Sequence, residues 1–244
     1  MSARASLGTA ARVLAQVRRD RRTVALVFVV PPLLLALLKY VFDAQPGIFA
    51  RVGVPMVGLF PLVVMFLVTS IAMLRERTGG TLERLMSMPM AKLDLLIGYG
   101  LAFAGVAAVQ AAITGAVAFV LLGVKSDGPV WAVIALAVSN AELGMALGLF
   151  LSAFATSEFQ AVQFLPAFIL PQLLLAGLFV PRAHMPHLLE GISAVMPFTY
   201  AFDALARVAV NDTGSGLVVD LAVIVSCVVL ALAAGAVTLR RRTA

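Results

Sequence analysis

The chain has 244 residues, of which 62% are hydrophobic and only 12% are charged. Soluble domains carry roughly 25% charged residues, so the composition excludes an ordinary soluble enzyme and indicates an integral membrane protein. The formal net charge is +6, but the basic residues flank apolar runs. They therefore indicate membrane topology and attraction to anionic lipids, and no nucleic-acid partner is expected. Cys227 is the single cysteine, so no disulfide can form within the chain.

Six apolar runs are long enough to cross a membrane. A helix needs about 20 apolar residues to span a hydrocarbon core of roughly 30 Å. The predicted spans cover residues 23–42, 52–74, 94–122, 130–155, 160–180 and 216–239. No segment between them is long enough to form a soluble domain. We therefore expect one all-α transmembrane domain covering residues 1–244.

The basic residues predict the orientation of this domain. Six spans place both termini on the same side of the membrane, and basic residues accumulate on the cytoplasmic side. On the side of the termini lie Arg4, Arg12, Arg18, Arg19, Arg21, Arg22, Arg75, Arg77, Arg84, Lys92, Arg240, Arg241 and Arg242. On the other side lie Lys39, Arg51, Lys125, Arg182 and Arg207. The imbalance predicts that both termini and the 75–92 loop are cytoplasmic.

The segment before the first span has an amphipathic pattern. Leu7, Ala10, Leu14 and Val17 recur at helical spacing, and the arginines lie mostly off that stripe. The pattern predicts a helix over about residues 4–21 in the headgroup plane. The alternative is a disordered basic tail. The first span exceeds the 7–15 residues of a secretory signal core, so it is expected to be retained.

The loop between the second and third spans is unusually charged and has helix boundaries of its own. Gly79 and Gly80 disfavour continuation of the second span, and Thr81 is an acceptable N-cap. Glu83 in the first turn is favoured by the helix dipole, and Pro89 marks the end. The pattern predicts a helix of about two turns.

This short helix has a small apolar face. Leu82, Leu85 and Met86 fall at i, i+3 and i+4, away from Glu83 and Arg84. Such a face suits either the lipid interface or a groove on a partner protein. The residue pattern by itself leaves both alternatives open.

The segment from 182 to 212, between the last two spans, is broken into short pieces. Its prolines are Pro181, Pro186 and Pro197. Pro186 and Pro197 suit the first turn of short helices over about 186–194 and 197–210. These helices could dip into the membrane and return, or form a surface hairpin.

Two motifs resemble those of a known family. The first is Arg75-Glu-Arg-Thr-Gly-Gly-Thr-Leu-Glu-Arg-Leu-Met-Ser-Met-Pro-Met90, after the second span. The second is Met196-Pro-Phe-Thr-Tyr-Ala-Phe-Asp-Ala-Leu-Ala-Arg207, between the last two spans. Their order and spacing resemble the ABC-2 type permeases, the membrane subunits of ATP-binding-cassette exporters. The resemblance covers essentially the whole chain.

The resemblance assigns roles to segments of this chain. Residues 1–22 would form a cytoplasmic elbow helix, the 75–92 loop would contain the coupling helix, and 182–212 would be an outer re-entrant segment. The implied ATPase-coupling residues are Thr81, Leu82, Glu83, Arg84, Leu85, Met86 and Pro89. The implied re-entrant signature is Pro197, Thr199, Tyr200, Asp203 and Arg207.

The chain lacks the means to hydrolyse ATP. It has no G-x-x-x-x-G-K-[ST] loop, and the residues from Gly123 to Ser126 lack the required spacing. The resemblance implies separate ATPase subunits that bind ATP and magnesium, and a second permease copy as homodimer or heterodimer. This chain is expected to bind no cofactor and to contact membrane lipids.

The expected function is ATP-driven export across a bacterial plasma membrane. The spans contain few charged residues, which favours a hydrophobic small molecule such as a drug, an antibiotic or a lipid as cargo. No catalytic residue is expected in this chain.

Glu142 is the only acidic residue well inside a predicted span. An ionised side chain there is costly, so a partner or a wet cavity is expected, with Asn140 and Gln110 as candidates. Glu142 would line the substrate path or a subunit contact, or would only stabilise packing. The alternative function is a proton- or ion-coupled secondary transporter. Gly144 and Gly148 on the same span permit close helix approach.

His184 and His187 form an H-x-x-H pattern in the outer segment. Two histidines without a third ligand do not make a zinc site, so no metal is expected. An intramembrane enzyme that uses these histidines is a further alternative, but no nucleophile motif supports it.

Overall fold

The computed structural model describes residues 3–81 and 92–238. Within these two ranges the chain is helical and has no strand, which confirms the all-α prediction. Six segments are long and apolar enough to cross a membrane, as the hydropathy predicted. They are Arg21–Val41, Pro46–Thr78, Ile97–Leu121, Val130–Phe154, Glu158–Leu175 and Ser215–Thr238.

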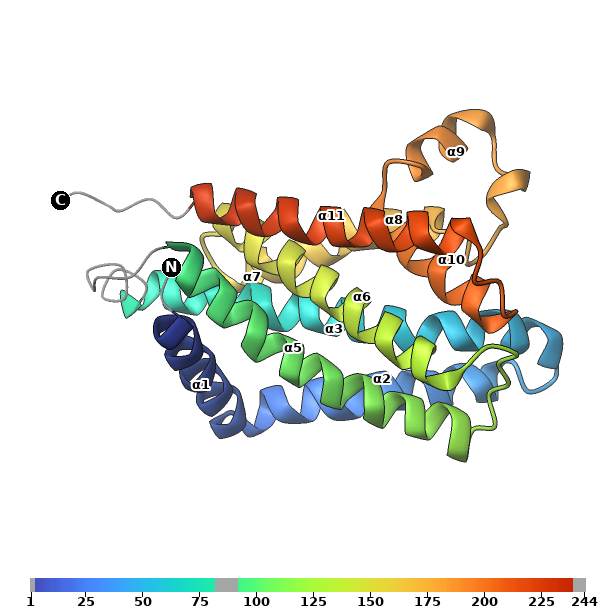
Figure 1. Ribbon diagram of the computed structural model, residues 1–244, viewed down its shortest axis with the longest axis horizontal. Coiled ribbons are helices and arrows are strands. Elements are labelled where there is room, and N and C mark those ends of the chain that lie inside the picture. Colours follow the sequence, from blue (N-terminus) through green and yellow to red (C-terminus); the bar gives the residue numbers. More distant parts are fainter. Residues whose placement is uncertain (1–2, 82–91, 239–244) are drawn as a thin grey trace.

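The helices are named as in Figure 1. The α-helices are α1 (Ala3–Arg19), α2 (Arg21–Val41), α3 (Pro46–Thr78), α5 (Lys92–Ala116), α6 (Val130–Leu151), α7 (Glu158–Phe164), α8 (Leu170–Leu175), α9 (His187–Ser193), α10 (Pro197–Ala209) and α11 (Ser215–Thr238). The π-helical turns are Val117–Leu121 and Leu165–Ile169, and the 3-10 turns are Ser152–Phe154 and Arg182–His184.

The spans form an elongated bundle with different structures at its two ends (Figure 1). The start of α1 and the end of α11 lie at one end, because six crossings return the chain to the side where it began. We call this the α1 end. Helices α9 and α10 lie toward the other end, which we call the α9 end.

Helices α3 and α6 form the centre of the bundle, and glycines allow them to lie close together. A Cβ at Gly144 would overlap the carbonyl oxygen of Leu62. A Cβ at Gly148 would overlap the carbonyl oxygen of Phe66 and the hydroxyl of Thr69. The close approach predicted from the glycine pair is therefore confirmed.

The boundaries of two spans differ from the prediction. Helix α3 covers Pro46–Thr78 and extends well beyond the predicted 52–74 at both ends. The fifth span ends at Leu175 and not near residue 180. Gly177 directly beyond it adopts a φ of 95°, which ends the helix and turns the chain.

Candidate functional site

The transition from α3 into the following loop matches the glycine pattern. The helix ends at Thr78, the Gly79 N–H donates to the carbonyl of Arg75 at 2.9 Å, and Gly80 adopts a φ of 70°. Thr81 is the last described residue before the gap. The other predicted coupling residues, Leu82, Glu83, Arg84, Leu85, Met86 and Pro89, lie outside the described residues. Their docking role stays a prediction.

The first helix is present, and its protein-facing side is made of small residues. Ser6, Thr9 and Ala10 are buried, and α1 lies so close to α5 that a Cβ at Gly98 would be 2.8 Å from the Ser6 carbonyl oxygen. Leu7 and Leu14 from the predicted apolar stripe are 61% and 41% exposed. The stripe is therefore split, and its leucines remain available to lipid.

A sharp corner separates α1 from α2. Asp20 is the N-cap of α2, and its Oδ1 accepts the backbone N–H groups of Arg22 at 3.0 Å and Thr23 at 3.3 Å. The Thr23 hydroxyl also donates to the Asp20 carboxylate at 2.8 Å. These hydrogen bonds lower the pKa of Asp20 below its ordinary value, and the bond from the Thr23 side chain has the largest effect.

Glu76, two residues before the end of α3, is buried in a three-residue polar cluster. Its Oε1 lies 2.7 Å from Nη1 of Arg12 on α1, and its Oε2 accepts the hydroxyl of Tyr99 on α5. Arg12 Nη2 also donates to the Tyr99 oxygen at 3.2 Å. We call Arg12, Glu76 and Tyr99 the Glu76 cluster. It joins α1, α3 and α5, and no sequence pattern distinguishes this buried glutamate from the other charged residues of the same stretch.

The neighbouring residue, Arg75, holds a different set of helices. Its Nε and Nη2 donate to the two carboxylate oxygens of Glu158 on α7 at 2.8 and 3.0 Å. Its Nη1 lies 3.8 Å from Asp20 at the α1–α2 corner. Arg75 and Glu158 are more than half exposed, so the bond positions α7 more than it stabilises the fold. Arg75 therefore connects the end of α3 to α7 and to the α1–α2 corner, and Glu76 connects it to α1 and α5.

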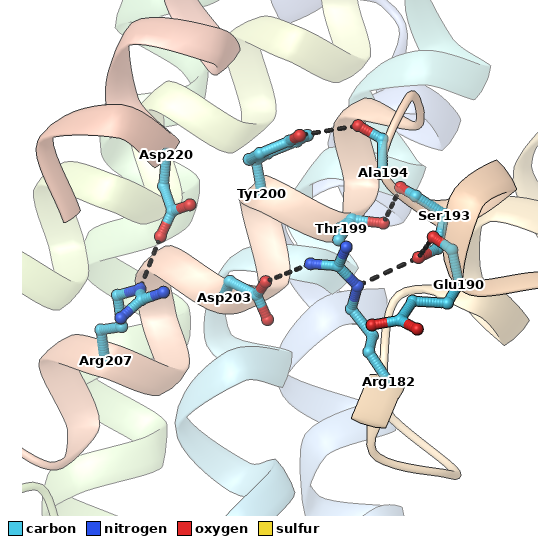
Figure 2. Close-up of polar contacts among 9 residues, drawn as sticks. All are labelled: Arg182, Glu190, Ser193, Ala194, Thr199, Tyr200, Asp203, Arg207 and Asp220. Atoms are coloured by element: carbon cyan, nitrogen blue, oxygen red, sulfur yellow. Dashed lines mark hydrogen bonds and ion pairs between the residues drawn. The ribbon is translucent and has the colours of Figure 1, made fainter. Parts of the chain in front are cut away.

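At the α9 end, the predicted signature residues close the turn between α9 and α10. Pro197 lies at the first position of α10, as predicted, whereas Pro186 is the N-cap of α9 and lies just before its first turn. The Thr199 hydroxyl donates to the Ser193 carbonyl at 2.7 Å, and the Tyr200 hydroxyl donates to that of Ala194 at 2.6 Å. Figure 2 shows both bonds.

Two arginines, Arg182 and Arg207, extend this arrangement, and Figure 2 shows their bonds to Asp203 and Asp220. Arg182 donates to Asp203 at 3.2 Å and to the Ser193 hydroxyl at 3.0 Å. Arg207 donates through Nε to Asp220 on α11 at 2.9 Å and through Nη1 to Asp212 at 3.0 Å. Burial raises the pKa of Asp203, and Arg182 opposes that shift.

Of these residues, Asp203 and Arg207 were predicted, and their partners Arg182 and Asp220 were missed. The two histidines of the outer segment take no part in this arrangement. His187 is exposed, with its Nδ1 3.8 Å from Glu190. Within residues 3–81 and 92–238, no group of three His, Cys, Asp or Glu side chains is arranged to hold a metal ion.

The expected polar partners of Glu142 bind elsewhere. Gln110 donates to the Val27 carbonyl of α2 at 2.7 Å, and Asn140 donates to the Ala201 carbonyl of α10 at 3.0 Å. Neither amide donates to Glu142, because each joins its own helix to a neighbouring backbone, and the place of these residues in a substrate path or subunit contact stays a prediction. The buried Oε1 of Glu142 has no hydrogen-bond partner in the described part of the chain.

The comparison with protein families decides the identity of this bundle. The model of the ABC-2 type transporter family matches residues 8–209, which include both motifs. The chain belongs to the ABC-2 type transporter family. An ABC-2 permease is a membrane transport component and is not itself a catalyst. The resemblance seen in the two motifs is confirmed, and the chain is a multi-pass membrane protein.

Two known transport proteins are similar in sequence to this ABC-2 permease. It is 26% identical over 147 residues to the ABC transporter G family member 20 of Dictyostelium discoideum, a match that covers 60% of this chain and 20% of the relative. It is 24% identical over 163 residues to the probable multidrug ABC transporter permease YbhR of Escherichia coli, covering 67% and 44%. The matches thus span about a fifth and less than half of these relatives.

Proposed function

We propose that this ABC-2 permease is the membrane subunit of an ATP-driven exporter in a bacterial plasma membrane. It would work with a second permease copy and with cytoplasmic ATPase subunits that bind ATP and magnesium. The observation that carries the proposal is the end of α3. Arg75 and Glu76 are fixed to four other elements directly before the segment that bears the coupling motif. The excess of basic residues at the α1 end supports a cytoplasmic location for it and for both termini.

In this proposal the elbow helix is α1 and the coupling helix lies at about residues 79–89. A movement of the coupling helix would reach α1 and α5 through the Glu76 cluster and α7 through Arg75. The largely buried Glu76 cluster would transmit such a displacement because it connects three rigid helices, whereas the exposed Arg75–Glu158 bond would change with it. Closure of two ATPases would then rearrange the spans around a path at the permease dimer seam.

The proposed role of the α9 end is to cap the exit side as a re-entrant segment. Helix α9 has 7 residues and α10 has 13, and both are shorter than the roughly 20 that a span requires. Leu188 on α9 and Val195 after it are 75% and 81% exposed. Apolar side chains with this exposure favour contact with lipid over contact with water. Ion pairs of Arg182 and Arg207 would keep the segment attached to the bundle.

The proposed cargo is a hydrophobic small molecule, a drug, an antibiotic or a lipid. Few charged residues lie within the spans, so the path offers mainly apolar surface. The E. coli relative is named a probable multidrug permease, which agrees with this class of cargo.

Replacement of Leu85 by Asp should weaken binding of the cognate ATPase at least about thirtyfold, the effect of losing an interface residue worth about 2 kcal/mol. The measurement is co-purification of the ATPase with the tagged permease from native membranes. Ser87→Asp is the matched control, because it places the same charge on the opposite face of the predicted helix. Equal retention of the ATPase by both variants would contradict the proposed docking face.

The secondary-carrier alternative is favoured by one observation, the unpartnered Oε1 of Glu142. Under our proposal, Glu142→Gln keeps the shape of the side chain and leaves ATP-dependent transport in liposomes unchanged. Collapse of the proton gradient should also have no effect. Transport that persists without ATP, follows the proton gradient and is lost in Glu142→Gln would favour the carrier and exclude the exporter.

A further inference from the structure

An open cavity of about 550 Å³ lies at the α1 end, bordered by α1, α2, α3 and α5. Its size falls within the roughly 300–1,000 Å³ typical of small-molecule sites. Polar side chains line it where α2 begins and α3 ends, among them Asp20, Arg22 and Arg75. No residue of the 182–212 segment lines it, and neither do Glu142, Asn140 and Gln110.

The lining of this cavity becomes apolar along the helix axes. Leu26 lies one turn into α2, Leu67 and Ile71 precede Arg75 on α3, and Phe103 lies further along α5. At 1.5 Å per residue, Leu67 lies about 12 Å along the axis from Arg75. The cavity is therefore polar at the end of the bundle and apolar toward its middle, which matches the polarity of one leaflet of a bilayer.

The charged groups that line the cavity leave one cation without a partner. Asp20 accepts the hydrogen bonds of its N-cap, Glu76 is paired with Arg12 and Tyr99, and Arg75 is paired with Glu158. Among the described residues, the Arg22 guanidinium has no hydrogen bond or ion pair. The cavity therefore offers an available positive charge beside an apolar pocket.

The surroundings strengthen this positive character. Arg18, Arg19, Arg21 and Arg22 are all exposed around the corner between α1 and α2. Asp20 is the single acidic residue of the corner, and its carboxylate is occupied by the helix cap. Clustered arginines beside membrane spans attract anionic lipids. The exposed Leu7 and Leu14 on α1 place this end of the bundle at the membrane interface.

We propose that the cavity binds a phospholipid with an anionic headgroup, taken from the leaflet at the α1 end. The headgroup phosphate would contact Arg22, and an acyl chain would lie against Leu26, Ile71 and Phe103. The bound lipid would fill the space between α1 and the spans and hold α1 at a fixed distance from α2. The proposal requires only that the protein lies in a membrane, and it does not depend on the ATPase or on the cargo.

Native mass spectrometry of the purified permease tests the charge requirement. Detergent-solubilised protein is titrated with palmitoyl-oleoyl phosphatidylglycerol and, separately, with the phosphatidylcholine that has the same chains. We expect phosphatidylglycerol to bind more tightly. Arg22→Gln should weaken its binding about fivefold, as expected for the loss of one basic residue near an anionic lipid. Arg21→Gln, at a neighbouring exposed position that does not line the cavity, should weaken binding clearly less, because it removes only part of the general positive charge of the corner.

A second pair of variants tests the apolar pocket. Leu26→Trp should fill the cavity and lower the occupancy of bound phosphatidylglycerol, whereas Val29→Trp on an exposed position of the same helix should not. Arg22→Gln keeps the backbone N–H that Asp20 caps, so it tests the site even if Leu26→Trp fails to fold. Equal effects of Arg22→Gln and Arg21→Gln, or equal binding of the two lipids, would overturn the proposal.

Discussion

Replacement of Gly144 by valine should destabilise the bundle by about 3 kcal/mol or more, at the upper end of the usual cost of overpacking a core. The new Cβ would overlap the carbonyl oxygen of Leu62 and lie 3.1 Å from its Cα. These atoms belong to the backbone of α3, so no side-chain rotation relieves the clash. Helices α3 and α6 would have to separate along their whole contact.

Unfolding of the detergent-solubilised protein by heat or denaturant measures this effect. Gly105→Val on α5 is the matched control, because a Cβ at Gly105 meets no atom within 4 Å. It carries the same change in helix propensity and should cost less than about 1 kcal/mol. Gly148→Val should resemble Gly144→Val, since its Cβ would overlap the carbonyl oxygen of Phe66. Similar losses at Gly105 and Gly144 would contradict close packing of α3 and α6.

The spans were predictable because hydropathy over about 20 residues reports directly on membrane crossing. The ends of the spans were harder to predict. The glycines at 79 and 80 marked the end of α3 correctly, since Gly80 adopts a positive φ. Gly177 carries the same signal with a φ of 95°, and the fifth span ends before it, about five residues short of the predicted end.

The contact face of α1 was not predictable from its apolar stripe. In water, an apolar stripe identifies the side that packs on the protein, but in a bilayer the lipid is as apolar as leucine. Ser6, Thr9 and Ala10 therefore face α5, because small residues let backbones approach closely, and Leu7 and Leu14 stay exposed. Small residues are the better guide to packing in such a helix.

The polar contacts were predictable only where a motif keeps them local. Thr199 and Tyr200 bind carbonyl groups six residues earlier, and the motif identified both residues. Glu76 pairs with Arg12 across 64 residues. Charge patterning along a helix reports neighbours three or four positions away, so it could not reveal a pair that forms only when α1 and α3 come together.

The arrangement of Arg75 and Glu76 gives the end of α3 two distinct kinds of attachment. The Arg75–Glu158 bond is exposed and can break and re-form at low cost. In the Glu76 cluster, Glu76 and Tyr99 are buried and hydrogen-bonded, and Arg12 is half-buried, with its Nε unpartnered in the described part of the chain. A moving coupling segment would therefore be expected to change the contact with α7 first, while α1, α3 and α5 move together.

Replacement of Arg12 by alanine should cost about 3 kcal/mol of unfolding free energy, the lower end of the range for breaking a buried ion pair. The Glu76 side chain is only 9% exposed and would be left with the Tyr99 hydroxyl as its remaining donor. Arg4→Ala removes an exposed arginine from the same helix and should have little effect.

A double-mutant cycle separates the ion pair from the packing of the Arg12 side chain. If the pair carries the cost, Arg12→Ala combined with Glu76→Gln should lose at least about 1 kcal/mol less than the sum of the two single losses, since residues in one polar network couple by roughly 0.5–3 kcal/mol. Additive losses would mean that Arg12 acts through its aliphatic chain and its contacts with Tyr99, and not through the pair with Glu76. In that case the Glu76–Arg12 pair would not hold α1 to α3 through charge, and the exposed contact of Arg75 with Asp20 would be left as the ion pair between the end of α3 and the α1–α2 corner.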